Sequence, residues 1–427
     1  MEPTQSLADL THAAHGQQPA AMNALAQALV RAGQTEHALA WYTRGAAAGD
    51  TTALIEAGRM LAYGVGCDVD IAQALAHWQQ AERQDSAAAR YLLANLAITD
   101  TPLALAPQAA AHLHAAAAAD YPPALRALAI QHGRIDHPQQ QRCCVVLLER
   151  AAAAGDALAA ALLAERLLRG EGVPPQPEAA AQLLRQLQPL GITALPDVRI
   201  APPDPSSPDH AGDPVGDVHH IRFAAPKNLT TRRHDAPIIE EVSGVLSADE
   251  CRLLMLLARP HLRASQVVDP NDASTHRAPI RTSRGATLDP ILDDFAARAA
   301  QARVAACAQL PLTHAEALSV LCYAPDEHYR THRDYLPPGT IAADRPAAGN
   351  RLRTACVYLN EVGAGGETEF PLAGIRVQPR AGSVVCFDNL HADGRPDPDS
   401  LHAGLPVTTG SKWLGTLWFR QQRYRHW

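Results

Sequence analysis

The sequence predicts a multidomain protein, with an N-terminal all-α solenoid of helical-hairpin repeats followed by a C-terminal domain of short β-strands. Three observations support this prediction. Alanine-rich segments of the first half recur with a period of about 35 residues, which is typical of stacked helical hairpins. The last part contains short β-rich runs, such as Arg351–Asn360 and Ser383–Asp388, bounded by Gly and Pro. Between them, Leu195–Asp217 is too rich in Pro, Asp, Gly and Ser to bury an apolar face, which indicates a linker.

The repeat is marked by four aspartates at spacings of 35, 35 and 36 residues: Asp50, Asp85, Asp120 and Asp156. Glycine loops near Gly64 and Gly170 recur at about three periods and allow tight turns between helices. The segment WYTRGAAAGD resembles Sel-one-like repeats, a tetratricopeptide-related family that forms α-solenoids. The resemblance implies that the repeats bind another protein. The alternative is that their helices pack on the C-terminal domain or mediate a homodimer.

We expect an N-terminal segment over 1–20, a Sel-one-like repeat domain over 21–190, a Pro- and Asp-rich linker over 191–236 and a β-rich domain over 237–427. A chain of 427 residues is long enough for two domains with their own cores. The first residues are polar and acidic, and no apolar run is long enough for a membrane span, so we expect a cytoplasmic location. The eight cysteines form no CxxC pair, which favours reduced thiols over disulfides or zinc.

Two residues in the C-terminal part, His332 and Asp334, form a pattern that can bind a metal ion. Side chains two positions apart on a strand point to the same face, so the imidazole and the carboxylate can reach one cation. His402 would be the third ligand. Two histidines and one carboxylate leave three octahedral positions open, as in Fe(II) oxygenases. His391 and Asp393 have the same spacing, but their Gly-, Pro- and Asp-rich surroundings predict a solvated loop.

A lysine follows the third histidine on what we expect to be a returning strand. The segment PVTTGS contains a turn signal, after which Lys412, Thr416 and Trp418 share one strand face. At about 3.3 Å per residue, a few positions of offset place Lys412 roughly 7 to 15 Å along from His402. This gap suits a five-carbon diacid, with one end on the metal and the other paired with the lysine ammonium. A lysine that faces a barrel interior needs such a counter-charge.

Residues from about Ile238 to Tyr424 resemble the catalytic domain of the prolyl 4-hydroxylases, within the 2-oxoglutarate and Fe(II)-dependent dioxygenase superfamily. The resemblance rests on motifs in a fixed order: SGVLSADEC, RTS, HRD, NRLRT, YLNEV, GGETEF, AGSVVCFDN and LHAG. It implies a double-stranded β-helix (jelly-roll) domain with supporting helices. It also implies Fe(II), 2-oxoglutarate and O2, with ascorbate as a further candidate cofactor.

The same resemblance assigns roles to nine residues. It assigns iron ligation to His332, Asp334 and His402. It assigns binding of the distal 2-oxoglutarate carboxylate to Lys412, Tyr323 and Thr354. It assigns catalytic or substrate-contacting positions to Arg281, Ser283 and Trp418, the first two on a mobile substrate loop. Ordinary packing is the alternative for the two hydroxyls that would help the lysine and for the tryptophan.

The net charge of −7, without a cluster of Lys and Arg, argues against a nucleic-acid substrate. We therefore expect a dioxygenase that hydroxylates a prolyl residue in a protein or peptide, with the repeats recruiting the partner. Two alternatives stay open: hydroxylation of another residue or of a free amino acid, and a repeat-based scaffold. The Pro- and Gly-containing segment 335–350 departs from the family pattern near the expected site mouth, which leaves the substrate open.

Overall fold

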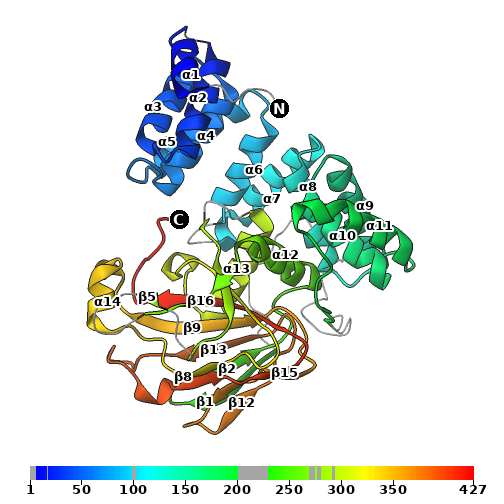
Figure 1. The fold of residues 1–427 in the computed structure, drawn as a ribbon, viewed down its shortest axis with the longest axis vertical. Helices are drawn as coiled ribbons and strands as arrows, with labels where there is room; N and C mark the ends of the chain where they lie inside the picture. Colours follow the sequence, from blue (N-terminus) through cyan, green and yellow to red (C-terminus); the bar gives the residue numbers. More distant parts are fainter. Residues whose placement is uncertain are drawn as a thin grey trace.

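The computed structural model describes residues 6–16, 18–98, 102–200, 229–268, 275–276, 280–290 and 294–427. A helical solenoid and a β-domain of two sheets are visible in Figure 1, with the helices α12 and α13 between them. Residues 201–228, which make up most of the predicted linker, lie outside the described residues. None of the helices in the described ranges has the length and hydropathy needed to cross a membrane.

The first half is a succession of short helices, as the period of the sequence predicts. The buried side chains of these helices are mostly alanine and leucine, and most of the helices leave polar side chains on the opposite side. The helices are α1 (Leu7–Ala14), α2 (Pro19–Arg31), α3 (Thr35–Ala47), α4 (Thr51–Tyr63), α5 (Ile71–Glu82), α6 (Ala87–Leu96), α7 (Pro102–Ala118), α8 (Pro122–Gly133), α9 (Pro138–Ala153), α10 (Ala157–Arg169) and α11 (Pro177–Leu187).

The four periodic aspartates lie in the turns before α4, α6, α8 and α10, but at two adjacent positions. Asp50 and Asp156 are N-caps, whose carboxylates accept a hydrogen bond from the third backbone N–H of the helix. Asp85 and Asp120 precede the cap and have φ of 62° and 53°, where the other two turns have glycine. Aspartate is one of the few residues that tolerate this left-handed conformation. The repeat therefore conserves the turn geometry rather than one role for the aspartate.

The β-domain has a large and a small antiparallel sheet. The large sheet has the order β1-β2-β13-β9-β16-β7-β6-β3, and the small sheet has the order β12-β11-β14-β8. This pair of sheets with helices on one side confirms the predicted jelly roll. The strands of the large sheet are β1 (Thr230–Asp235), β2 (Ile238–Val242), β3 (Arg263–Ala264), β6 (Arg284–Thr287), β7 (Ser319–Tyr323), β9 (Arg351–Tyr358), β13 (Val384–Asp388) and β16 (Lys412–Arg420).

The small sheet consists of β8 (Tyr329–His332), β11 (Thr368–Phe370), β12 (Ile375–Val377) and β14 (His402–Gly404). Two further strand pairs are short: β4 (Val267–Val268) with β5 (Thr275–His276), and β10 (Ala364–Gly365) with β15 (Val407–Thr409). The helices of this domain are α12 (Ala248–Ala258), α13 (Phe295–Ala308) and α14 (Pro338–Ala343).

Alternation along the central strands separates two environments. On β9, Cys356 and Tyr358 lie in the core between the two sheets, whereas Ala355 and Val357 pack in the core shared with α13. Residues of β16 alternate in the same way. The two-residue period of these runs therefore directs alternate side chains into the space between the sheets, as the sequence predicts for Leu352, Thr354, Cys356 and Tyr358.

The solenoid and the β-domain share one hydrophobic core, through α12 and α13. Leucines and alanines of α8 and α10 pack in the same cluster as Leu253, Phe295 and Phe419. Three buried carboxylates of the β-domain each bind an arginine of the repeats: Asp249 with Arg166, Glu250 with Arg134 and Asp294 with Arg126. The two halves are therefore parts of one packed molecule.

The predicted linker, 191–236, differs from the structure at both ends. Leu195 and Val198 are buried, and the Leu195 N–H donates to Glu165 at 3.0 Å. At the other end, β1 begins at Thr230 and pairs with β2 in the large sheet. The composition of the whole segment concealed these short ordered ends, because a few apolar positions among many prolines and aspartates do not change the average.

Candidate metal centre and active site

The three predicted metal ligands converge. Strands β8 and β14 pair with His332 directly opposite His402, and Asp334 follows β8 by two positions. The Nε2 atoms of His332 and His402 lie 3.6 and 3.7 Å from the two carboxylate oxygens of Asp334. One ligand atom from each residue lies within 4.8 Å of the others. Among the residues that the structure describes, no other group of three His, Cys, Asp or Glu side chains meets this condition.

Both imidazoles are oriented by backbone carbonyls. Nδ1 of His332 lies 2.8 Å from the carbonyl oxygen of Arg330, and Nδ1 of His402 lies 3.0 Å from that of Ser400. A carbonyl only accepts hydrogen bonds, so each Nδ1 carries the proton and each Nε2 keeps its lone pair for a metal. Burial and the neighbouring His402 lower the pKa of His332 to about 3, so this ring is neutral at neutral pH.

The carboxylate of Asp334 is fixed by a hydrogen-bonded pair behind it. The Thr354 hydroxyl donates to Oδ2 at 2.8 Å, and the Asn389 amide donates to the same hydroxyl at 2.9 Å. Burial by itself would raise the pKa of Asp334, but the two histidines and Arg351 lower it to about 2. Two neutral nitrogens and one anionic oxygen that face one point are the donor set that Fe(II) takes in this class of site, so the residues fit the metal.

Aromatic rings surround the two histidines. Tyr329 stacks on His332, with ring centroids 3.5 Å apart and planes 14° from parallel. Phe387 and Phe370 lie beside His402, at 4.5 and 5.8 Å between centroids. Such an apolar wall limits access of water to the ligand atoms.

Lys412 is buried in the same space between the sheets. Its side chain is 2 % exposed, and Nζ lies 5.5 Å from the ring centroids of both Tyr323 and Tyr358. Within the described chain, no carboxylate forms an ion pair with this ammonium. Burial lowers the pKa of Lys412 to about 8. A buried ammonium in this setting is ready to accept an anion.

The two hydroxyls predicted to assist Lys412 lie at different ends of the site. Tyr323 is the direct cross-strand neighbour of Lys412. Thr354 is instead opposite Trp418, six positions further along β16, and its hydroxyl is bound to Asp334. Six residues of strand span about 20 Å. The register therefore sets the Thr354 backbone apart from that of Lys412, and the Thr354 hydroxyl holds a candidate metal ligand; its help in binding the distal carboxylate stays a prediction.

Two of the residues predicted to be catalytic, Arg281 and Ser283, differ in what they contact. The Arg281 guanidinium lies 4.9 Å above the Tyr329 ring, on the edge of the metal centre. Ser283 is buried, and its hydroxyl lies 2.9 Å from that of Ser265. The Ser283 side chain also forms a hydrogen bond with that of Tyr323, the cross-strand neighbour of Lys412, so both residues border the site. Part of the predicted substrate loop, residues 269–274 and 277–279, lies outside the described residues.

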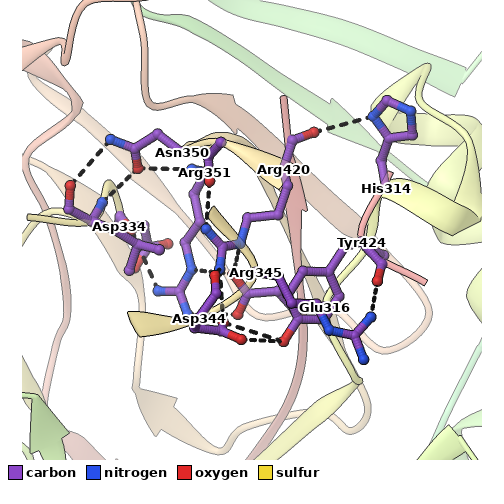
Figure 2. Close-up of polar contacts among 12 residues, drawn as sticks. His314, Glu316, Asp334, Asp344, Arg345, Asn350, Arg351, Arg420 and Tyr424 are labelled. Carbon is purple, nitrogen blue, oxygen red and sulfur yellow. Dashed lines mark hydrogen bonds and ion pairs between the residues drawn. The ribbon is translucent and has the colours of Figure 1, made fainter. Parts of the chain in front are cut away.

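An ion-pair network that the sequence did not predict borders Asp334 (Figure 2). Arg351 donates to both carboxylate oxygens of Glu316, at 2.8 and 2.7 Å. Its Nη1 also donates to the carbonyl of Asp334 at 3.4 Å, and its guanidinium lies 4.1 Å above the Trp418 ring. Arg420 Nε lies 2.8 Å from the same glutamate. The motif NRLRT showed an arginine, but its partner is 35 residues away, a pairing that one sequence does not reveal.

The second His-x-Asp pair stays outside the site. Asp393 is exposed and binds Arg395 at 2.7 Å, and Nδ1 of His391 lies 3.6 Å from Asp397. These contacts agree with the predicted solvated loop.

The segment 335–350 contains α14, and its two ends are joined by Asn350. The side chain of Asn350 accepts from the Leu336 N–H at 2.7 Å and donates to the Leu336 carbonyl at 3.1 Å.

Comparisons with known proteins identify both parts of the chain. The family model of the 2OG-Fe(II) oxygenase superfamily matches residues 318–420, and Sel1 repeat models match 19–50, 51–86, 122–156 and 157–187. Prolyl 4-hydroxylase 1 of Arabidopsis thaliana is 35% identical over 201 residues, which cover 44% of this chain and 70% of that protein.

Two solved structures align with different halves. The viral collagen prolyl hydroxylase of Paramecium Bursaria Chlorella virus-1 is 25% identical, with a TM-score of 0.33 over 43% of this chain and 95% of that one. A Sel1 repeat protein from Oxalobacter formigenes is 23% identical, with a TM-score of 0.37 over 44% of this chain and 57% of that one.

The jelly roll, its two histidines and carboxylate, and the matching superfamily model define a 2-oxoglutarate- and Fe(II)-dependent oxygenase preceded by Sel1 repeats. Within that class, the chain belongs to the prolyl 4-hydroxylase family. It is a dioxygenase whose family uses Fe(II), 2-oxoglutarate and O2.

Proposed function

We propose that this enzyme hydroxylates prolyl residues in a protein or peptide, and that free surfaces of its repeats recruit the substrate or a partner. Membership of the prolyl 4-hydroxylases supports the reaction. The observation that carries the proposal is the combination of an open three-ligand site with a buried lysine that lacks a counter-ion. A protein that served only as a scaffold would gain nothing from keeping these groups buried together.

The residues have separable tasks in this reaction. His332, Asp334 and His402 would hold the metal, which when bound supplies the oxygen activation that an unactivated C–H bond requires. Lys412 would bind the distal carboxylate of 2-oxoglutarate by a charge-assisted hydrogen bond, beside Tyr323. The aromatic wall and the fixed imidazoles would hold the reactants in place and exclude water.

The Trp418 surface of the site favours a neutral peptide group. The Trp418 indole Nε1 is buried and has no acceptor among the described residues. A buried donor needs a partner, so we assign this N–H to a backbone carbonyl of the substrate. Arg351, which lies on the same ring, is already neutralised by Glu316. A free amino acid would bring a carboxylate that Arg351 and Arg420, both paired with Glu316, could not neutralise; Arg281, on the Tyr329 ring, forms no ion pair among the described residues and is the cation that could do so.

Part of the repeat surface is already taken by the catalytic part of the chain. Helices α4, α6, α8 and α10 contact it through Ala62, Tyr91, Arg126 and Arg166. The alternative that repeat helices pack on the C-terminal domain therefore holds for these four helices. Recruitment would use repeat surfaces that such contacts leave exposed.

The reaction can be tested with the full-length protein, Fe(II) and 2-oxoglutarate. Asp334→Ala should abolish succinate formation, because it removes one of three protein ligands, whereas Asp393→Ala should retain it. Proteins captured by the intact enzyme, analysed by mass spectrometry before and after reaction, should gain one oxygen atom on proline. Oxygen on another residue type, or on free amino acids alone, would overturn the proposed substrate.

Three finer points stay predictions. Stimulation by ascorbate would be seen as prolonged turnover in the same assay. A homodimer would be seen by sedimentation of the purified protein. A cytoplasmic location would be seen by fractionation of cells that express the full chain.

A further inference from the structure

The segment Gln421–Trp427, which follows β16, reaches from the active-site sheet to the first repeats. Trp427 is only 8 % exposed and lies between α4 and α13. Its indole N–H donates to the Ala62 carbonyl at 2.8 Å, and its ring centroid is 5.1 Å from that of Tyr63. The Arg298 guanidinium lies 4.2 Å above the same ring. A hydrogen bond, an aromatic contact and a cation–π contact together hold this side chain in one place.

The middle of the segment clamps the backbone that precedes β7. The buried Arg425 donates to the carbonyls of Ala315 and Glu316, at 2.9 and 2.7 Å. The backbone N–H groups of Tyr424 and Arg425 both donate to the Thr313 carbonyl, at 2.8 and 2.7 Å. Residues 313–316 therefore take several of their hydrogen bonds from this segment.

The clamped backbone carries Glu316, whose side chain lies among Arg351 and Arg420 in the network that borders Asp334 (Figure 2). Its carboxylate holds Arg351 by two hydrogen bonds, and Arg420 lies 2.8 Å away on the other side. Arg351 in turn contacts the Asp334 carbonyl and stacks on Trp418. The orientation of Arg351 thus depends on a short piece of backbone that the segment Gln421–Trp427 fixes.

A second branch leads from the same segment to the site mouth. The Tyr424 hydroxyl lies 3.3 Å from both carboxylate oxygens of Asp344, which ends α14. The Arg345 guanidinium lies 4.6 Å from the centroid of the Tyr424 ring. The mouth segment 335–350 and the wall around Glu316 are therefore attached to one and the same strip of chain.

We propose that Gln421–Trp427 is a tie through which the repeat domain positions the active-site wall. Trp427 is its anchor in the repeats, and Glu316 is the positioning residue through which it acts on Arg351. The repeats would then contribute to turnover from within the molecule, independently of any partner that they recruit. If the anchor is lost, the segment no longer donates hydrogen bonds to the carbonyls of 313–316, which then bond to water instead. The backbone that carries Glu316 is then no longer fixed.

Hydrogen exchange of the metal-free full chain tests the first half of the proposal without any substrate. In Trp427→Ala, the amides of Tyr424 and Arg425, which donate to the Thr313 carbonyl, should exchange about ten-fold faster than in the wild type, because the released segment no longer holds them on that acceptor. Trp427→Phe keeps an aromatic ring but loses the indole N–H, so its exchange rates should lie between those of the wild type and Trp427→Ala. Tyr91→Phe is the matched control, since it removes another contact between the repeats and α13, the Phe295 N–H bond of 2.9 Å, without touching the segment.

The second half is tested by a double-mutant cycle on hydroxylation of poly-L-proline. Trp427→Ala and Glu316→Gln should each lower kcat/KM by about ten-fold, and the double variant should be no worse than Glu316→Gln alone, since both act on Arg351. The dissociation constant for 2-oxoglutarate should stay unchanged, because Lys412 lies at the other end of β16. Independent losses that multiply, or unchanged exchange at Tyr424 and Arg425, would overturn the tie. If poly-L-proline is not a substrate, the exchange result decides alone.

Discussion

At the scale of single residues, Lys412 determines how tightly the cosubstrate would bind. Burial disfavours the charged form of this lysine and lowers its pKa to about 8. A bound carboxylate would reverse that effect by supplying the missing counter-charge. Both the size of the interaction and its pH dependence follow from this one side chain.

Removal of the ammonium should weaken binding of 2-oxoglutarate while iron binding is retained. A hydrogen bond to a charged group contributes about 1.5 to 3 kcal/mol, so Lys412→Ala should raise the dissociation constant roughly ten- to a hundred-fold. Anaerobic titration of the Fe(II)-loaded protein, followed by its visible charge-transfer band, would measure this. Asp393→Ala is the control, because that carboxylate is exposed and lies outside the site. Equal affinities for wild type and Lys412→Ala would mean that another cation binds the cosubstrate.

The same titration should depend on pH in a defined direction. Below pH 8 the free lysine is already charged, so affinity changes little with pH. Above pH 8 the lysine must take up a proton on binding, so the dissociation constant should rise by up to about ten-fold per pH unit. Lys412→Arg stays charged over this range and should give a flatter profile. A wild-type profile that is flat from pH 7 to 9 would contradict the lowered pKa.

Residue types and their spacing predicted most of this site. The remaining contacts depend on how neighbouring strands align, which the sequence does not give. The spacing of His332 and Asp334 brings them to one metal site, although β8 ends at His332 and Asp334 lies just beyond it, and the two-residue period of β16 directs Lys412 inward. The assignment of Thr354 to the lysine needed the offset between two strands, which no local pattern contains. The Arg351–Glu316 pair needed a contact across 35 residues and was absent for the same reason.

At the scale of elements, α12 is the helix on which the contact between the two halves depends. Its capping box places Ser247 against Glu250, and the next carboxylate, Asp249, is buried between Arg166 and Arg252. The helices and turns of the solenoid were predictable, because the same sequence pattern recurs in each repeat. The role of α12 was not predictable, because its apolar and charged faces resemble those of a helix that packs within its own domain.

Loss of the central carboxylate of α12 should destabilise the whole chain. Asp249→Ala leaves two buried arginines with less compensation, a change that typically costs about 3 to 5 kcal/mol. Urea unfolding followed by circular dichroism would measure the difference. Asp68→Ala, at an exposed position, should change the free energy of unfolding by less than about 0.5 kcal/mol. Similar values for both variants would show that the buried cluster contributes nothing specific.

Acid should act on the same helix. Burial alone would raise the pKa values of Asp249 and Glu250, but their arginine partners lower both below the ordinary values of 3.8 and 4.5. A carboxylate with a lowered pKa in the folded state stabilises the fold above its unfolded pKa and loses that contribution as the pH falls. The free energy of unfolding should therefore be level near neutrality and decline below about pH 4.5. Asp249→Asn should show a shallower decline, and an equal slope would contradict this assignment.

At the scale of the whole molecule, the two halves are expected to be inseparable in function although a linker separates them in sequence. The shared core includes leucines of α8 and α10 and the inner faces of α12 and α13. Without the repeats, Asp294 would lose Arg126, and Arg252 would lose the bidentate Glu171, with hydrogen bonds of 2.6 and 2.7 Å. The β-domain alone would then expose apolar surface together with unpaired charges, a combination that favours aggregation.

Cleavage of the linker therefore should not separate the halves. With a protease site inserted between residues 201 and 228, the two fragments should co-elute after cutting and unfold in one transition, because the buried contacts hold them without the connection. Residues 229–427 produced alone should aggregate or lack a cooperative transition. Arg126→Ala combined with Arg166→Ala is the decisive control, since it removes two of the arginines that cross the interface and should let the cut fragments dissociate. Fragments of the wild type that separate freely would mean that the repeats are only tethered, and the coupling through Trp427 would then have no rigid support.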